Sequence, residues 1–126
     1  MQTFIYHIAL IKDWRRALER GCYELPSLAS EGFLHCSTAS QLVDTANLHF
    51  RGHRRVLLLK ICVDKLSAPL RFEQSRDQQE FPHLYGPLNC SAVDSVKAWA
   101  VGTEALFTEP TADNLSALSD EQDLAP

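Results

Sequence analysis

The sequence lacks the features that mark metal-ribbon, disulfide-scaffold and membrane proteins. Its 126 residues hold four cysteines, which are spread along the chain with no Cys-x-x-Cys pair, so neither a zinc ribbon nor a redox motif is indicated. The longest apolar run, residues 56–59, is far shorter than the ~20 residues of a membrane span. No basic segment followed by an apolar one begins the chain. We therefore expect a cytoplasmic protein with reduced thiols and no membrane insertion.

The chain also lacks a broad excess of positive charge. It has 12 Lys and Arg against 16 Asp and Glu, but five of the acids follow residue 108. Residues 1–108 therefore carry 12 bases against 11 acids, which is typical of neither a nucleic-acid binder nor an acidic protein. The local basic cluster of residues 51–55 is interpreted as a solvated turn, or alternatively as a docking surface for a protein partner.

What is present indicates one globular domain. Hydrophobic residues make up 45% and charged residues 22% of the chain, and a chain of this length buries about two-thirds of its unfolded surface without metal or disulfide support. We assign residues 1–108 to a single domain. Residues 109–126 are acidic and weakly patterned, so we expect a frayed tail.

Hydrophobic periodicity predicts an α+β fold. Strands are expected at 3–10, 33–36, 55–63 and 70–73, and a closing hairpin at 91–107. Helices are expected at 12–20, with Asp13 as N-cap, and from Thr38 to Gly52, where Thr38 and Gln41 have capping-box spacing. Residues 23–31 are expected to form a loop with one helical turn, and residues 74–88 a long functional loop. Strands and helices in this order favour α+β over repeated βαβ units.

Two segments place polar groups where a structural role does not need them. His7 shares one face of its strand with Ile5 and Ala9, so its imidazole is either a core group bonded to backbone or a ligand contact. Residues 31–38 (EGFLHCST) bring His35, Ser37 and Thr38 to a helix start, where free N–H groups suit an anion such as phosphate. Cys36 points away from His35 and is interpreted as a buried, inert thiol.

A third polar segment, residues 81–88 (FPHLYGPL), combines two prolines with His83 and Tyr85. Such a stiff loop suits recognition of a ring or a ribose, and equally suits a cover over the core. Glu73 and Glu80 are the nearby carboxylates for acid–base or cation-stabilising work. Three histidines could converge, but no short ligand pair anchors a zinc site, so we expect no metal.

These blocks resemble a known family. The set YHI (6–8), Trp14, EGFLHCST (31–38), TAN (45–47) and FPHLYGPL (81–88) is similar to the bacterial and plant family named domain of unknown function 952, over residues 3–108. That family resembles the ADP-ribosyltransferase superfamily in fold. The resemblance implies two small, mostly antiparallel β-sheets with two or three helices, and a cleft that binds NAD as co-substrate.

By this resemblance, specific residues acquire roles. His7 matches the first-strand histidine that contacts a ribose, and His35, Ser37 and Thr38 match the second motif. Glu73 is the carboxylate assigned to support positive charge on the ribose, with Arg71 or His83 as substitutes. We thus expect His7, His35, Glu73 and His83 to be catalytic. Ser37, Thr38, Arg71 and Tyr85 are expected to bind substrate.

Three functions follow as hypotheses. The first is an enzyme that binds NAD or an ADP-ribose-type nucleotide and transfers or cleaves at the ribose. The second is a module that binds a nucleotide-like metabolite without chemistry. The third is an interaction domain that uses the tail or residues 51–55. Retained geometry around Glu73 favours the first, and a closed, dry cluster of His7, His35 and His83 favours the second.

Overall fold

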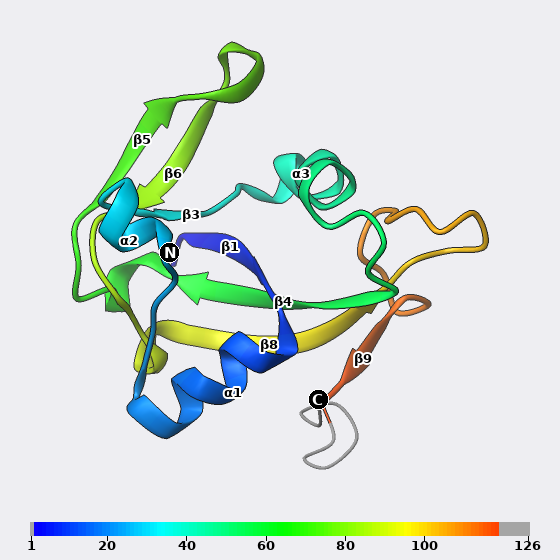
Figure 1. Ribbon diagram of the computed structural model, residues 1–126, viewed down its shortest axis with the longest axis horizontal. Helices are drawn as coiled ribbons and strands as arrows, with labels where there is room; N and C mark the ends of the chain where they lie inside the picture. Colours follow the sequence, from blue (N-terminus) through cyan, green and yellow to red (C-terminus); the bar gives the residue numbers. More distant parts are fainter. Residues whose placement is uncertain (1, 119–126) are drawn as a thin grey trace.

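The computed structural model describes residues 2–118, which form an α+β fold of small antiparallel sheets and three α-helices (Figure 1). The strands among these residues are β1 (Phe4–Ala9), β2 (Cys22–Tyr23), β3 (Leu34–His35), β4 (Arg55–Cys62), β5 (Leu70–Gln74), β6 (Glu80–Leu84), β7 (Leu88–Asn89), β8 (Val93–Ala100) and β9 (Leu115–Ala117). The helices are α1 (Ile11–Arg20), α2 (Ser27–Ser30) and α3 (Leu42–His49), with short 3-10 turns η1 (Ala39–Gln41), η2 (Val63–Lys65), η3 (Arg76–Gln78) and η4 (Cys90–Ala92). No helix of this part of the chain is long and apolar enough to cross a membrane.

A four-stranded antiparallel sheet in the order β1-β4-β8-β9 forms the centre of the molecule. Its strand β4 lies between two neighbours and has helices over both faces. Residues Val56, Leu57, Leu58 and Leu59 are therefore all buried, as the near-continuous apolar run predicts.

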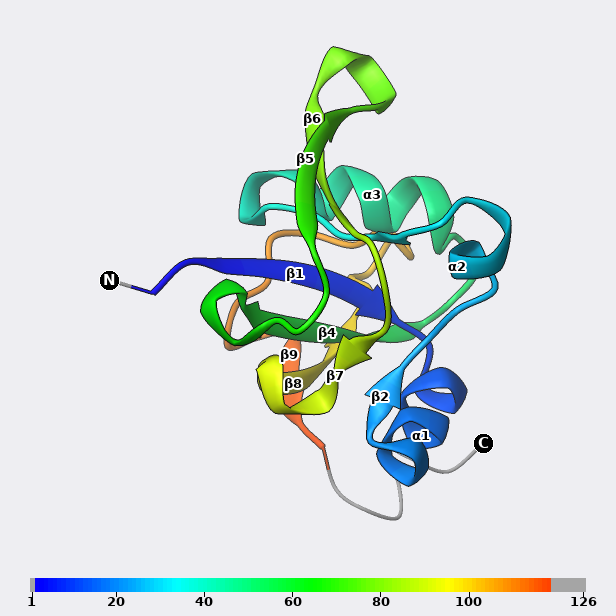
Figure 2. The same cartoon turned by 90° about the vertical axis from the view of Figure 1, so that its left-hand side faces the viewer.

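The two longer helices cover opposite faces of this sheet, as both views show (Figures 1 and 2). Trp14 and Ala17 of α1 pack into the core cluster that contains Ile5. Leu42 and Ala46 of α3 belong to the other cluster. Alternate residues of β1 thus serve different cores, and His7 lies on the face that α1 covers.

A second sheet, in the order β3-β6-β5, stands beside the free edge of β1. Its β5–β6 hairpin projects from the body (Figure 2). Tyr6 and Ser37 join the two sheets, because each N–H donates to the carbonyl of the other residue over 2.8 Å. β2 and β7 form a separate two-stranded pair, so the structure has three antiparallel sheets where two were expected.

Several expected elements differ from those observed. Residues 80–84 were expected in a loop but form β6, where the Pro82 carbonyl accepts the Cys36 N–H over 3.0 Å. The expectation failed because proline and histidine mask a short strand whose pairing comes from distant residues. Helix α1 begins at Ile11 after Leu10, so Asp13 lies in its first turn and is not the N-cap.

The end of the chain also departs from expectation. The partner of β8 is β9, which lies inside the segment expected to be frayed, and residues 105–107 form no strand. β9 shows little hydrophobic alternation because only Leu115 of its three residues is half-buried. Residues 119–126, to which the frayed-tail prediction also applied, lie outside the described residues.

Candidate functional site

A cleft of about 670 Å³ opens between the two larger sheets, helix α3 and the tip of the β5–β6 hairpin. Six of its polar lining residues come from four parts of the chain: His7, His35, Ser37, Thr45, His49 and Arg76. Much of the remaining wall is apolar and is formed by Leu25, Leu48, Phe50 and Phe81. A volume of this size, with apolar walls and a few convergent polar groups, is typical of a small-molecule site.

Both ring nitrogens of His7 have partners. Nδ1 donates to the His35 carbonyl oxygen over 2.7 Å, since a carbonyl can only accept. Nε2 therefore accepts, and its partner is the Tyr23 hydroxyl at 3.0 Å. Burial lowers the pKa of His7 to about 4, so the ring is neutral at pH 7. His7 thus fixes the β3 backbone beside the cleft and has no free nitrogen for a ligand.

Residues 35–38 approach the cleft in different ways. His35 is half exposed, and its Nε2 lies 2.8 Å from the Glu31 carboxylate. Ser37 is buried, with its hydroxyl 3.5 Å from that of Thr45. Thr38 does not line the cleft. Its N–H donates to Gln41 Oε1 over 3.0 Å, and both halves of the predicted capping box are present. Cys36 is buried, and burial raises the pKa of its thiol to about 12.

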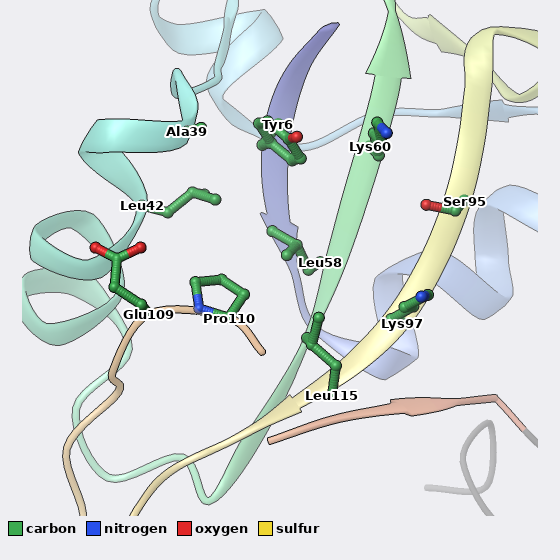
Figure 3. A pocket seen from close by; sticks show the side chains of 10 residues that line it. All are labelled: Tyr6, Ala39, Leu42, Leu58, Lys60, Ser95, Lys97, Glu109, Pro110 and Leu115. Carbon is green, nitrogen blue, oxygen red and sulfur yellow. The ribbon is translucent and has the colours of Figure 1, made fainter. Parts of the chain in front are cut away.

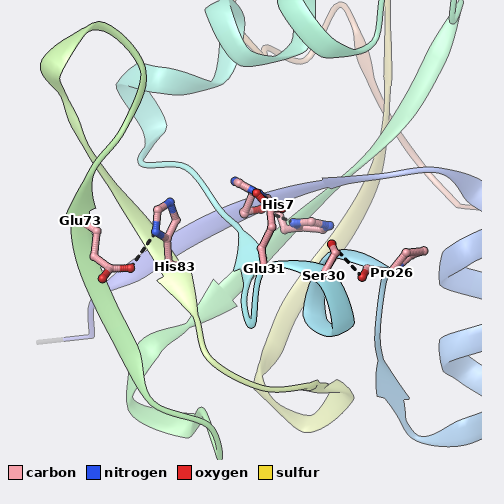
Figure 4. A network of polar contacts seen from close by, with 7 residues as sticks. His7, Pro26, Ser30, Glu31, Glu73 and His83 are labelled. Atoms are coloured by element: carbon pink, nitrogen blue, oxygen red, sulfur yellow. Dashed lines mark hydrogen bonds and ion pairs between the residues drawn. The ribbon is translucent and has the colours of Figure 1, made fainter.

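The other predicted site residues form a second group on and next to the β5–β6 hairpin, of which Figure 4 shows Glu73 and His83. His83 Nδ1 lies 2.9 Å from Glu73 Oε1, and the Tyr85 hydroxyl donates to the same oxygen. These bonds from Tyr85 and His83 lower the pKa of Glu73, so its carboxyl group is ionised at pH 7. The Arg71 guanidinium lies 5.0 Å from the centre of the Tyr85 ring.

His83 has one satisfied ring nitrogen and one unsatisfied one. An ionised carboxylate only accepts, so Nδ1 carries a proton, and in the neutral ring Nε2 is an acceptor. The residue is 4% exposed, and Nε2 has no hydrogen-bond partner among the described residues. The ring stacks on Phe33 with centroids 4.0 Å apart. A buried nitrogen without a partner is uncommon and marks a position where a further polar group would be stabilised.

The two groups touch through a histidine pair. His35 and His83 are register partners on β3 and β6, and their ring centroids lie 5.5 Å apart. His7 joins them through its bond to the His35 carbonyl. The structure therefore brings these three histidines together, but of the three His7 and His35 line the cleft and His83 does not. Glu73, Arg71 and Tyr85 are also outside its lining.

The cleft also contains polar residues that sequence reasoning did not select. Thr45 and His49 are four residues apart on α3 and share one face of that helix, which is a signal the sequence offered. Arg76 follows β5 in a tight turn where Asp77 and Gln78 have φ of 57° and 60° and the Gln79 N–H donates to the Arg76 carbonyl over 3.1 Å. Nothing local in the sequence indicates that this arginine reaches α3.

A smaller cavity of about 330 Å³ lies elsewhere on the central sheet (Figure 3). Lys60 and Lys97 line it from β4 and β8, and Glu109 lines it from the segment after β8. The Lys60 ammonium group lies 4.2 Å from the centre of the Phe4 ring. None of the residues that the sequence singled out for chemistry belongs to this cavity.

Metal-ligand geometry is not found in the part of the chain that the structure describes: no three His, Cys, Asp or Glu residues there are grouped to hold an ion. His35 contacts Glu31, and Glu73 is shared by His83 and Tyr85.

Comparison with known proteins places the chain in a family. Residues 8–96 match the model of the family described as Protein of unknown function (DUF952). The X-ray crystal structure of protein CC0527 from Caulobacter crescentus is 32% identical, covers 84% of this chain and 94% of that one, and has a TM-score of 0.77. Its solution NMR structure is 31% identical, covers 83% and 91%, and has a TM-score of 0.73. No curated protein matches the chain. The chain therefore belongs to the DUF952 family, as its sequence blocks predict.

Proposed function

We propose that the protein binds a nucleotide of the NAD or ADP-ribose type in the cleft between its two larger sheets. The observation that carries this proposal is the lining of the cleft, which combines apolar walls with histidines, hydroxyls and one arginine in about 670 Å³. Apolar walls suit a base or nicotinamide ring, and the polar groups suit ribose hydroxyls and phosphates. The fold that we propose for this site is the ADP-ribosyltransferase-like one, in which two small antiparallel sheets flank the nucleotide.

The reaction that we attach to this binding is cleavage or transfer at the ribose. The bond between ribose C1′ and the nicotinamide nitrogen breaks, nicotinamide leaves with the electron pair, and a nucleophile attacks C1′ and loses its proton. An ionised Glu73 suits the positive charge that develops on the ribose. His83 Nε2, oriented through the bond between Nδ1 and Glu73, suits the acceptance of that proton.

The second candidate function is nucleotide binding without turnover. One observation favours it: Glu73 and His83 do not line the cleft, and the free nitrogen of His83 is buried. For chemistry to occur, the ligand would have to reach past His35, whose ring adjoins that of His83. His35 is 53% exposed at its side chain, so its ring has room to turn away.

An NMR titration with NAD, ADP-ribose and a 2′-phosphorylated nucleotide tests the binding. We expect localised shifts at His35, Ser37 and Thr45, with the exposed Glu19 of α1, which lies outside the cleft, as the internal reference that does not shift. No shifts at millimolar ligand would reject nucleotide binding.

Release of nicotinamide from NAD then separates the two candidates. If the protein is an enzyme, its rate of nicotinamide release should fall by roughly 100-fold or more in Glu73→Gln, because one contact to the transition state is lost. Glu19→Gln is the matched control, because this glutamate is exposed on α1 and lies outside the cleft. Binding with no release from the unmodified protein would establish the non-catalytic module.

A further inference from the structure

Arg76 is positioned inside the cleft by three side chains from other parts of the fold. Its Nη2 donates to Thr45 Oγ1 over 2.9 Å, and Nη1 lies 3.4 Å from His49 Nε2. The guanidinium carbon lies 4.9 Å from the centre of the Phe81 ring. The side chain is 24% exposed, so the charge is partly withdrawn from water and held over one wall of the cleft.

Among the described residues, the positive charge of Arg76 is paired only with a solvent-exposed carboxylate near the limit of ion-pair distance. Its one acidic contact joins Nε to Asp77 Oδ2 at 3.8 Å, and the Asp77 side chain is 74% exposed. Both terminal nitrogens contact neutral groups, since arginine has no acceptor and His49 must accept through Nε2. Besides burial, the charge of Arg76 lowers the pKa of His49, which keeps that ring neutral at pH 7.

We infer that Arg76, Thr45 and His49 form the subsite that binds the phosphate groups of the ligand. This inference rests on the proposed function and assigns the place where the phosphate groups of the nucleotide bind. A guanidinium offers five N–H donors in a planar fork that fits phosphate oxygens. The contacts with Thr45 and His49 use two of them, so other donors of Arg76 are available to a ligand. The Thr45 hydroxyl and the Nδ1 proton of a neutral His49 add further donors beside it.

The position of this subsite also fixes the direction of the ligand. Arg76 and His49 lie at the hairpin tip and the end of α3, whereas His35 leads toward Glu73 and His83. A dinucleotide with its phosphates at Arg76 would place a ribose toward His35. The start of η1 at Thr38, which the sequence suggested for phosphate, does not line the cleft.

Binding measurements with three ligands test the subsite: ADP-ribose, adenosine and inorganic pyrophosphate. We expect Arg76→Gln to weaken ADP-ribose at least about tenfold, because a charged hydrogen-bonding partner is lost. Adenosine affinity should not change, and Arg76→Lys should retain part of the ADP-ribose affinity because it keeps the charge. Arg16→Gln is the matched control, since Arg16 is exposed on α1 and lies outside the cleft.

The outcomes separate this inference from the proposed function. Unchanged ADP-ribose affinity in Arg76→Gln would overturn the subsite and leave nucleotide binding standing. Pyrophosphate that shifts the Thr45 and His49 signals, without binding of NAD or ADP-ribose, would support the subsite and reject the nucleotide. Failure of all three ligands to bind the unmodified protein would overturn both. Native NMR spectra of Arg76→Gln and Arg76→Lys establish that each variant is folded.

Discussion

Acidification should destabilise the fold through His7, the buried neutral histidine beside the cleft. The pKa of His7 is about 4 in the folded protein, against 6.5 for an ordinary histidine. Above pH 6.5 the ring is neutral in both states, and the stability is fully present. As the pH falls toward 4, the imidazole of His7 binds a proton in the unfolded chain but not in the folded protein, so the free energy of unfolding decreases.

The magnitude follows from the pKa difference. Each pH unit between the two pKa values costs about 1.4 kcal/mol, so a difference of about 2.5 units costs about 3 kcal/mol. That is a large share of the 5–15 kcal/mol typical of a domain. The cause is structural: protonation of Nε2 would break the bond from the Tyr23 hydroxyl and place a charge among buried residues.

Urea unfolding at several pH values between about 7 and 4 measures this loss. Other groups titrate in the same range, so the unmodified protein is compared with His7→Gln, which replaces the titratable imidazole by an amide that does not titrate. The pH dependence should be shallower in His7→Gln, and the difference between the two curves should approach 3 kcal/mol at about pH 4. NMR of the imidazole in the native protein should find the proton on Nδ1 throughout.

Two results would refute the reasoning about His7. One is an imidazole that titrates near pH 6.5 in the native protein, which would mean that burial does not oppose its charge. The other is an equal pH dependence in the unmodified protein and in His7→Gln. Either result would also remove the argument that His7 supports the β3 backbone as a neutral donor and acceptor.

Three further predictions concern stability and are measured by urea or thermal unfolding at pH 7. Tyr23→Phe should cost about 1–3 kcal/mol because it leaves the buried Nε2 of His7 without a donor, and an unchanged stability would contradict that bond. Gln78→Gly should stabilise the protein by roughly 0.5–1 kcal/mol, since glycine adopts the φ of 60° without strain. A lower melting temperature would contradict the positive φ of this residue. Gly86→Ala should cost about 1–3 kcal/mol, because φ is 150° and a Cβ would lie 2.8 Å from that of Ala68; full stability would mean that the neighbouring segment gives way freely.

The sequence predicted the parts of the fold that depend on local patterns. Alternation in residues 3–10 placed His7 on the same face as Ile5 and Ala9, and these three residues are buried together. The apolar run of β4 indicated a strand covered on both faces, and Thr38 with Gln41 marked a helix start. In each case the physical cause lies within about ten residues of the chain.

Long-range pairing explains what the sequence did not predict. The strand β6 exists because residues 80–84 pair with β5 and with β3, which lies about fifty residues earlier. Arg76 reaches Thr45 across 31 residues, so no local spacing links them. Thr45 belonged to a block that carried the family resemblance, but its partner in the cleft depends on how the hairpin leans toward α3.

The three histidines that the sequence singled out differ in what their ring nitrogens contact. His7 has two partners and is 5% exposed, so both of its ring nitrogens are engaged in hydrogen bonds that stabilise the fold. His35 is open to solvent and has one exposed partner. His83 is fixed by Glu73 on one side and has no partner on the other, among the described residues.

This difference in hydrogen bonding distinguishes the three histidines, which the sequence alone does not. An imidazole with both nitrogens satisfied can act only as a positioning group, whereas a neutral one that is oriented by a carboxylate and has no partner at Nε2 can accept a proton. His35 lies between them: its carbonyl holds His7 and its ring adjoins His83. His35 is therefore the residue that lies between the binding cleft and the pair formed by Glu73 and His83.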